Sequence, residues 1–238
     1  MRQSNSYIII YSAILTVVCG GLLALAAEGL KERQQANVDL EQKKNILSTV
    51  ITLSEGDNVE AIYNKRVKAF VIDYNGNVIE GIVAKDVVVA AEYKKASQDR
   101  QLPVYEFRNE ADSSKLDAVV LPVYGYGLWN NIWGFVALTG DFNTVKGVSF
   151  KHAGETPGLG ARIESEEIQN RFKSKTVFEN GAVVSIFIQK GEGKDYSIDK
   201  HKVDGMSSAT LTGKGVNNML LDYFTCYQNY LKKNQSKQ

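Results

Sequence analysis

The longest hydrophobic run in the chain lies close to its N-terminus. Residues 8–27 read IIIYSAILTVVCGGLLALAA and contain no charged side chain. In an α-helix, a run of this length is about 30 Å long, which matches the hydrocarbon core of a bilayer. The pattern therefore predicts one transmembrane helix over residues 8–27, with residues 1–7 as a short segment in the cytoplasm.

The charges on either side of this run predict its orientation. Arg2 precedes the run, whereas Glu28, Lys31, Glu32 and Arg33 follow it and cancel one another. Basic residues favour the cytoplasmic side of a membrane. The rest of the chain is therefore expected on the outer face of the membrane, which is the periplasm where the cell has a second membrane.

Three other interpretations compete with a membrane anchor. Ala24-Leu25-Ala26 fits a signal-peptide cleavage site, but one basic side chain and a long apolar run favour an uncleaved anchor. A lipoprotein signal needs a small residue before the cysteine, and Val18 precedes Cys19. A buried core helix is disfavoured because a run that is apolar all round rarely opens a soluble domain.

A polar segment that favours a helix follows the apolar run. Leu30–Leu53 is rich in Lys, Glu and Gln, contains no Gly or Pro, and repeats apolar residues at roughly helical spacing. It predicts a helical stalk within residues 28–56, which the turn-forming Ser54–Asp57 would end. Residues 57–238 are then expected to form the folded domain.

Strand signals dominate the region after the stalk. Runs rich in β-branched and aromatic residues predict strands at Val67–Asp73, Val78–Ala84, Val104–Phe107, Ala118–Val123, Ile132–Leu138, Thr144–Phe150 and Ala182–Gln189. The first two flank Asn75-Gly76, which tolerates the positive φ of a tight hairpin turn. Helices are predicted over Asp86–Arg100 and Ser165–Phe172.

The C-terminal segment has the clearest helical pattern. Val216, Leu220, Phe224, Tyr227 and Leu231 recur at steps of three and four residues and so form one face of a helix. The helix is expected to start near Ser207 or Ser208. Strands combined with segregated helices predict an α+β domain, with an antiparallel sheet and flanking helices.

Composition and charge exclude several function classes. The chain is 44% hydrophobic and 23% charged with a net charge of +1, and it contains no long basic run that would indicate nucleic-acid binding. Its two cysteines and two histidines are widely separated, so no metal site is predicted within this chain. It also lacks a GxGxxG segment between a strand and a helix, which argues against direct NADH binding.

Three segments rich in glycine or hydroxyl groups are the candidates for chemistry. They are Tyr124–Trp129, Gly154–Gly160 and Asp204–Thr212. In the third, Ser207 or Ser208 can cap the terminal helix, which places Thr210 in its first turn. Backbone N–H groups there lack partners within the helix and lie at the positive end of its dipole, so a phosphate on Thr210 is well placed. The alternative from these residues alone is a helix cap without a ligand.

The third segment also resembles a known motif. Asp204, Ser207, Ser208, Ala209 and Thr210 resemble the flavinylation motif of the FMN-binding domain family, in which an Asp is followed at fixed spacing by Ser-Gly-Ala-Thr. The resemblance implies that Thr210 carries FMN as a phosphoester, attached by a separate flavin transferase that uses FAD. Ser208 departs from the usual Gly and would cost about 1 kcal/mol if the backbone must be left-handed there.

Other segments resemble one branch of this family. Gly127–Trp129 and Gly154–Gly160 resemble two further signatures, and Lys43–Leu47 and the single N-terminal span resemble the C subunits of sodium-translocating NADH:quinone oxidoreductases. This resemblance implies an electron relay without a catalytic residue of its own. Electrons would pass from an iron–sulfur centre in neighbouring membrane subunits to this FMN, then to an FMN on the B subunit, riboflavin and quinone, with sodium export coupled elsewhere. The B, D and E subunits are the implied partners.

The resemblance gives the two glycine segments a role as a flavin site. Glu155, Thr156, Gly158 and Gly160 belong to the expected site, with glycine letting the backbone approach a planar ring. Leu159 is expected to pack on the ring.

Trp129 would either stack on the ring or fill the core. Structural turns are the alternative role for both segments.

Two other functions compete with this interpretation. The G subunit of Rnf-type ferredoxin:NAD oxidoreductases shares the anchor and the flavin-bearing threonine, but the stalk and the segment around Trp129 favour the C subunit. A non-redox extracytoplasmic binding domain would use Ser207–Thr210 only as a helix cap.

Overall fold

The computed structural model describes residues 4–236. The chain divides into two units, and the boundary lies between residues 42 and 43. The first is most of helix α1 (Asn5–Ser48), whose first thirty-odd residues are exposed along their whole length. Of the helices in the described part of the chain, α1 alone is long and apolar enough to cross a membrane. The predicted apolar span and the predicted stalk therefore belong to one continuous helix, which ends at Ser48 rather than at Leu53.

The second unit is built on a six-stranded antiparallel sheet. Its spatial order is β2-β1-β3-β4-β5-β6. The strands are β1 (Val67–Ile72), β2 (Val78–Ile79), β3 (Leu102–Arg108), β4 (Leu116–Tyr126), β5 (Asn131–Thr139) and β6 (Val145–His152). Consecutive strands from β3 to β6 are neighbours, as the short connections between them require. The predicted α+β class with an antiparallel sheet is confirmed.

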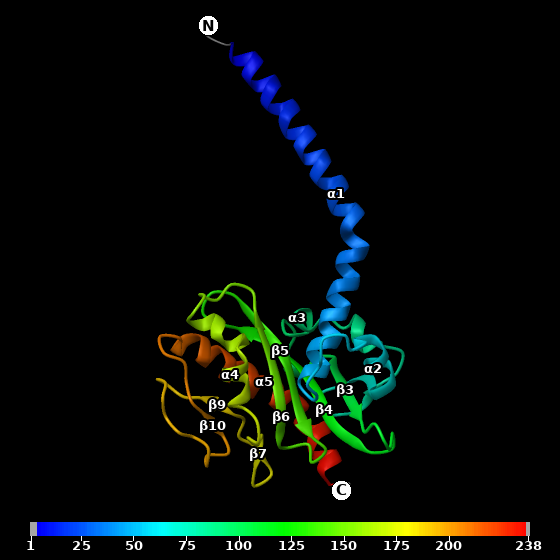
Figure 1. Ribbon diagram of the computed structural model, residues 1–238, viewed down its shortest axis with the longest axis vertical. Coiled ribbons are helices and arrows are strands. Elements are labelled where there is room, and N and C mark those ends of the chain that lie inside the picture. The colour runs from blue at the N-terminus through cyan, green and yellow to red at the C-terminus, as the bar shows by residue number, and fades with distance from the viewer. Residues whose placement is uncertain (1–3, 237–238) are drawn as a thin grey trace. The chain divides into compact units, whose positions relative to one another are not determined.

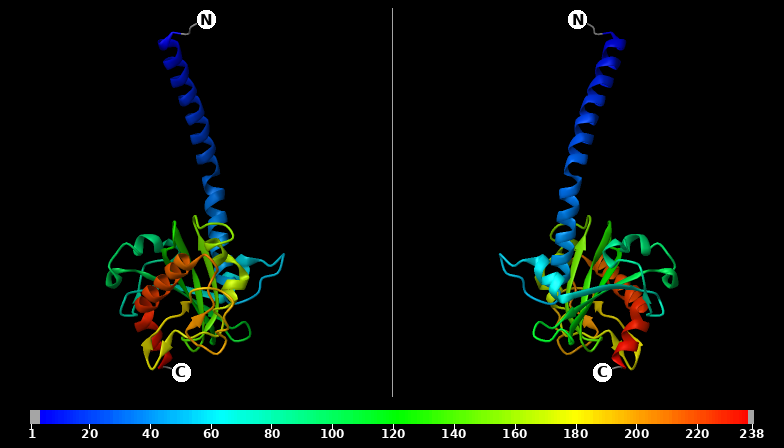
Figure 2. Two further views of the ribbon diagram at one scale, coloured as in Figure 1. Left: turned by 90° about the vertical axis from the view of Figure 1, so that its left-hand side faces the viewer. Right: turned by 90° about the vertical axis from the view of Figure 1, so that its right-hand side faces the viewer.

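Helices cover both faces of this sheet (Figure 1, Figure 2). Helix α5 (Thr210–Gln235) lies on one face, and α2 (Val59–Arg66) lies on the other together with the last turn of α1. Ile46 and Leu47 from that turn are buried because they pack against the sheet. Lys43–Ser48 therefore contributes to the domain core.

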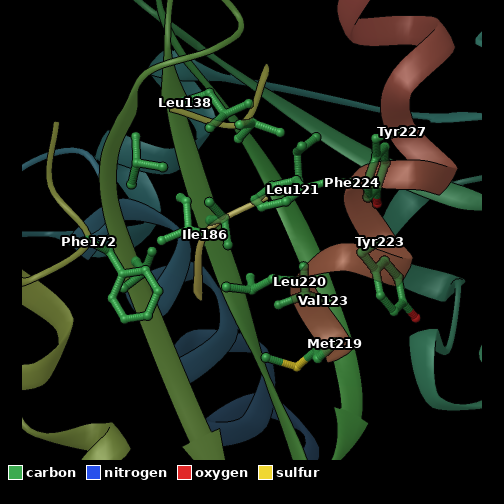
Figure 3. Packing of buried hydrophobic residues seen from close by; sticks show 14 of the residues in the cluster. Leu121, Val123, Leu138, Phe172, Ile186, Met219, Leu220, Tyr223, Phe224 and Tyr227 are labelled. Carbon is green, nitrogen blue, oxygen red and sulfur yellow. The ribbon is translucent and has the colours of Figure 1, made fainter. Parts of the chain in front are cut away.

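The main core lies between α5 and the sheet (Figure 3). Leu220 and Phe224 of α5 are fully buried and face Leu121 of β4, with Phe172 and Ile186 closing the sides. These positions on α5 belong to the three- and four-residue repeat in the sequence. The repeat therefore predicted the buried face of the helix correctly.

The remaining elements are short. They are the single-turn helices η1 (Ala84–Asp86), α3 (Val89–Glu92), η2 (Ser97–Asp99), η3 (Gly160–Glu164) and α4 (Glu166–Asn170), an antiparallel pair β7 (Phe178–Glu179) and β8 (Ala182–Val183), and a parallel pair β9 (Phe187–Ile188) and β10 (Lys202–Val203). The hairpin at Asn75-Gly76 is present, with φ +77° at Gly76. Its second strand is only two residues long, since the chain turns away at Gly81, where φ is +80°.

Two secondary-structure predictions are wrong. Asp86–Arg100 is not one helix, because the buried Arg100 binds the Asp222 carboxylate of α5 and two backbone carbonyls of its own segment, which fold it into short turns. Ala182–Gln189 is not one strand. Ser185 has φ +68°, and this left-handed residue sends the two halves to different partners.

Candidate functional site

Three segments far apart in sequence meet at the Glu155 carboxylate. Glu155 is 3% exposed and lies in the loop between β6 and η3. Its Oε1 accepts a hydrogen bond from the backbone N–H of Trp129 at 2.9 Å, and its Oε2 accepts one from the Thr212 hydroxyl at 2.5 Å. The carboxylate thus joins the β4–β5 turn to the first turn of α5.

Two glycines provide the space that this carboxylate occupies. A Cβ atom at Gly127 would collide with Glu155 Oε1, and a Cβ at Gly160 would collide with the Thr212 hydroxyl and lie 2.5 Å from Glu155 Oε2. Gly158 differs, because its φ is +75° and a Cβ there would meet open space. Gly160 therefore has a packing role within the domain, whereas Gly158 serves a left-handed turn with an open side.

Hydrogen bonds keep the Glu155 carboxyl ionised although it is buried. Burial by itself raises the pKa of Glu155. The Thr212 hydroxyl and the backbone amides of residues 128–130 lower it by more, so the net pKa lies below the ordinary value. The site thus contains a buried negative charge that neutral donors stabilise.

Exposed apolar residues stand at or beside the chain positions that hold this buried carboxylate. Leu128, Trp129, Leu159 and Leu211 each lie at, or next to, a residue that binds or packs against Glu155, and all four are exposed. We call these four residues the apolar rim. Trp129 is 69% exposed, so a role in filling the core is wrong and a role at the surface remains.

Thr210 is the first residue of α5 and is exposed. Thr212, two residues further along the helix, is 1% exposed and gives its hydroxyl to Glu155. A separation of two residues corresponds to a rise of about 3 Å, so Thr210 lies within one turn of the Glu155 anchor. The first amides of α5 have no partner within the helix, as in any α-helix.

The expectation that Ser207 or Ser208 caps α5 is wrong. The N-cap position belongs to Ala209, which makes no side-chain cap hydrogen bond. Ser208 has φ +59°, a left-handed conformation that turns the chain one residue before the cap. Glycine adopts this conformation freely, whereas serine costs about 1 kcal/mol there.

A second carboxylate holds the chain on the other side of Thr210. Glu192 accepts hydrogen bonds from Arg162 at 2.6 and 2.9 Å, from Arg171 at 3.1 Å, and from the backbone N–H of Ser207 at 2.9 Å. The bonds from Arg162 and then from Ser207 hold the pKa of Glu192 far below its ordinary value. Because Ser207 is tied to Glu192 and Thr212 to Glu155, Thr210 lies in a segment fixed at both ends.

Two other predicted site residues, Asp204 and Thr156, accept hydrogen bonds from backbone amides of nearby loops. The Asp204 carboxylate accepts hydrogen bonds from the amides of Gly193 at 2.8 Å and Lys194 at 3.1 Å, and lies 3.6 Å from Arg171. The Thr156 carbonyl accepts from two amides of its own loop. Both residues thus shape loops that border the site.

The sequence did not reveal the role of Glu192, Arg162 or Arg171. Arg162 and Glu192 are thirty residues apart, and neither belongs to a recognisable motif. The pattern Gly191-Glu192-Gly193 is typical of a loop, but a loop signal does not identify the partner of its charged residue.

Comparison with known proteins gives the class first. Residues 127–224 match the family model of the FMN-binding domain. This match begins at the glycine beside Glu155, spans both carboxylate anchors and includes Thr210. The class of protein defined by the fold and the site is therefore that of FMN-binding domain proteins.

Individual relatives define the branch. The chain is 34% identical to the C subunit of the Na(+)-translocating NADH-quinone reductase of Haemophilus ducreyi, over 94% of this chain and 91% of the relative. It is 32% identical to the C subunit of the same enzyme in Pseudomonas aeruginosa, over 92% of this chain and 91% of that relative. The crystal structure of the C subunit of the Na(+)-translocating NADH-quinone reductase of Parabacteroides distasonis matches this chain with a TM-score of 0.72 and 33% identity. The match covers 85% of this chain and 96% of that structure. The chain belongs to the family of C subunits of Na(+)-translocating NADH-quinone reductases.

Proposed function

We propose that this chain carries FMN, joined through its phosphate to the Thr210 hydroxyl. The observation that supports Thr210 most strongly is its contrast with Thr212, since one hydroxyl is exposed and the other is bound to Glu155. The residues fit the group, because a phosphate on Thr210 would meet the free amides of the first turn of α5 and the positive end of its dipole. The match to the FMN-binding domain family supports the same cofactor.

The apolar rim is the proposed binding surface for the flavin ring. Trp129 offers an aromatic face and Leu159 an aliphatic one, and both are exposed. Gly158 leaves open space beside the same loop. FMN, when bound, supplies a centre that takes up and releases electrons one or two at a time.

The proposed activity is electron relay inside a sodium-translocating NADH:quinone oxidoreductase. Membership of the C-subunit family supports this assignment over the Rnf G subunit and over a non-redox binding domain. We infer that electrons arrive from an iron–sulfur centre in neighbouring subunits and leave toward a second FMN on the B subunit and then quinone. The B, D and E subunits are the proposed partners. The isolated chain is expected not to oxidise NADH, because its sequence has no dinucleotide fingerprint.

The proposed location is the bacterial cytoplasmic membrane, with one pass. Residues 8–27 form the proposed span, residues 28–56 the stalk, and residues 57–238 the flavin-bearing domain on the outer side. The exposed apolar surface of α1 supports the span, and the position of Arg2 before it supports the orientation. Protease added to intact spheroplasts should remove the domain, and a protected domain would contradict the orientation.

The attachment site is tested by co-expressing the full chain with a flavin transferase. Thr210→Ala should fold normally, because its side chain is exposed, and should lack covalent flavin. Ser207→Ala is the matched control, since Ser207 is an exposed hydroxyl in the same segment and alanine keeps the backbone N–H that binds Glu192. The readouts are flavin fluorescence on a denaturing gel and peptide mass mapping. Flavin retained by Thr210→Ala, or mapped to another residue, would overturn the assignment.

A further inference from the structure

One outer edge of the main sheet is only partly covered. Strand β2 pairs with β1 at two positions, Val71 with Ile79 and Ile72 with Val78. The chain then turns away at Gly81. On its other side β1 pairs with β3 along its whole length from Val67 to Ile72. Within residues 4–236, the first part of β1 thus has a partner strand on its inner side and no strand on its outer side.

The backbone groups of Ala69 are directed toward this open side. In an antiparallel ladder, successive residues direct their N–H and C=O groups alternately to one neighbour and to the other. Val71 pairs outward with Ile79, and the Asp73 amide also bonds outward, to Asn77. Ala69 lies two residues before Val71, so its N–H and C=O also point outward, and the residue is exposed. Such groups on an edge strand are a template for an added strand.

A pocket of about 390 Å³ lies directly beside this edge. Lys68 and Phe70 of β1 line one side of it, and Tyr230 and Lys233 of α5 line the other. Lys68 and Phe70 alternate with Ala69, so they share the face of the sheet that α5 covers. Side chains of a strand added at Ala69 would reach this pocket at every second residue.

The pocket has a surplus of positive charge. Lys68 Nζ lies 6.0 Å from the centre of the Phe70 ring, and Lys233 Nζ donates to the neutral side-chain carbonyl of Asn77 at 3.1 Å. The one carboxylate in the lining, Glu106, is paired with Arg108 and also accepts from the Tyr230 hydroxyl. The Asn77 amide and, less strongly, the Lys233 charge lower the pKa of Asp73. Lys68 is therefore the more available of the two ammonium groups for an incoming carboxylate.

The wall of the pocket is rigid. The hairpin turn packs so closely on α5 that a Cβ at Gly76 would lie 2.7 Å from the Tyr230 backbone nitrogen. The Asn229 side chain donates to the Tyr74 carbonyl at 2.9 Å and holds the same turn. A preformed wall lowers the conformational entropy lost on binding. The pocket lies about 30 Å from Thr210, given the rise of 1.5 Å per residue along α5.

We propose that the outer edge of β1 at Ala69 binds an extended acidic segment of a partner protein as an added strand. The segment pairs its backbone with Ala69 and places a carboxylate side chain between Lys68 and Lys233. This mode combines main-chain hydrogen bonds, which give affinity, with one side-chain pocket, which gives specificity. The site is independent of the flavin site and stands even if Thr210 carries no cofactor.

The test uses the full chain in detergent and a fluorescent synthetic peptide, Thr-Val-Glu-Val-Thr. Saturable binding is expected, measured by anisotropy. Lys68→Glu should weaken it by about tenfold, since one attraction becomes a repulsion. Lys173→Glu, at an exposed lysine in another part of the domain, should leave it unchanged. A peptide with Lys in place of Glu should bind more weakly than the acidic one.

A second variant tests the added strand itself. Ala69→Pro removes the outward amide and keeps the ladder to β3, because edge strands tolerate proline on their open side. It should abolish peptide binding, and the peptide should slow hydrogen exchange of the Ala69 amide in the wild-type chain.

Four results would overturn the proposal. They are no binding of the acidic peptide, equal binding by Ala69→Pro, full competition by glutarate at the affinity of the peptide, or self-association of the chain through this edge. Glutarate competition would indicate a pocket for small anions, and self-association would indicate a second copy as the occupant.

Discussion

The two carboxylates on either side of Thr210 hold the chain by different physical means. Glu155 is buried and binds neutral donors, namely one hydroxyl and backbone amides. Glu192 is about one-fifth exposed in its side chain and binds the guanidinium groups of Arg162 and Arg171. The first is an anchor of the domain interior, and the second is a surface ion-pair network.

This difference shows which interactions position the site most firmly. When a buried carboxylate and its donors are separated, the polar groups left behind are unsatisfied and away from water. A surface ion pair that is lost leaves groups that water can solvate. Both anchors contact the segment that carries Thr210, but removal of Glu155 should disturb it far more.

The largest effect is therefore expected for Glu155→Ala. Its removal leaves the buried Thr212 hydroxyl and the amides of residues 128–130 without their acceptor, which should lower the free energy of unfolding by about 2–4 kcal/mol. Urea denaturation measures the change. Glu55→Ala is the matched control, since Glu55 lies in an exposed turn and should change stability by less than about 0.5 kcal/mol. Equal effects at the two positions would contradict the anchor role of Glu155.

A smaller effect is expected for Thr212→Val. Valine has the shape of threonine without the hydroxyl, so Glu155 loses one donor and the unfolding free energy should fall by about 1–2 kcal/mol. The same change at Thr210, which is exposed, should leave stability nearly unchanged and abolish flavin attachment. If both variants lose stability equally, the contrast between the two threonines is wrong.

The Glu192 network should contribute less and should respond to salt and acid. Glu192→Gln is expected to lower stability by no more than about 1 kcal/mol, and the loss should shrink in 1 M NaCl, where the Debye length is about 3 Å. The Glu155 effect should persist in salt, because that carboxylate is shielded from ions.

The same variant also tests the pH dependence. Because the folded-state pKa of Glu192 is lowered, its stabilisation is complete above the unfolded value of about 4.3 and is lost as pH falls through the folded-state pKa. The stability of wild type and Glu192→Gln should therefore converge as pH falls below about 4. A difference that grows with acidification would contradict this sign.

The smallest effect is expected at Ser208, between the two anchors. Ser208→Gly should raise stability by about 0.5 kcal/mol, because relief of the left-handed conformation outweighs the added freedom of glycine in the unfolded chain. Ser207→Gly, at the neighbouring exposed serine, should lower stability slightly. Thermal melts compared side by side would distinguish the two.

Local patterns predicted most of the sheet and the attachment segment. Strands β3 to β6 follow runs of β-branched and aromatic residues, and the buried face of α5 follows its apolar repeat. Thr210 is the proposed attachment residue because a motif of adjacent residues marks it, and this assignment stays a prediction. These features depend on neighbours in sequence, which is why they were predictable.

Long-range contacts account for what the sequence could not reveal. Arg100 binds Asp222, and that contact shapes the segment predicted as a helix. Ser185 is left-handed although serine rarely is, so the broken strand could not be foreseen. At Ser208 the family resemblance, through its usual glycine, was the one signal of a left-handed backbone, and no local pattern of this chain showed it. The Glu192 network joins residues that only the fold brings together.

The fixed segment around Thr210 has a consequence for the proposed attachment of FMN. Its backbone shape depends on Glu155 and Glu192, which come from other parts of the chain. If Thr210 is the acceptor, as proposed, the transferase would meet it on a folded surface, and a short peptide of residues 204–212 would have to be ordered at the moment of recognition. Maturation should then follow folding of the domain, so that only correctly folded chains receive the cofactor.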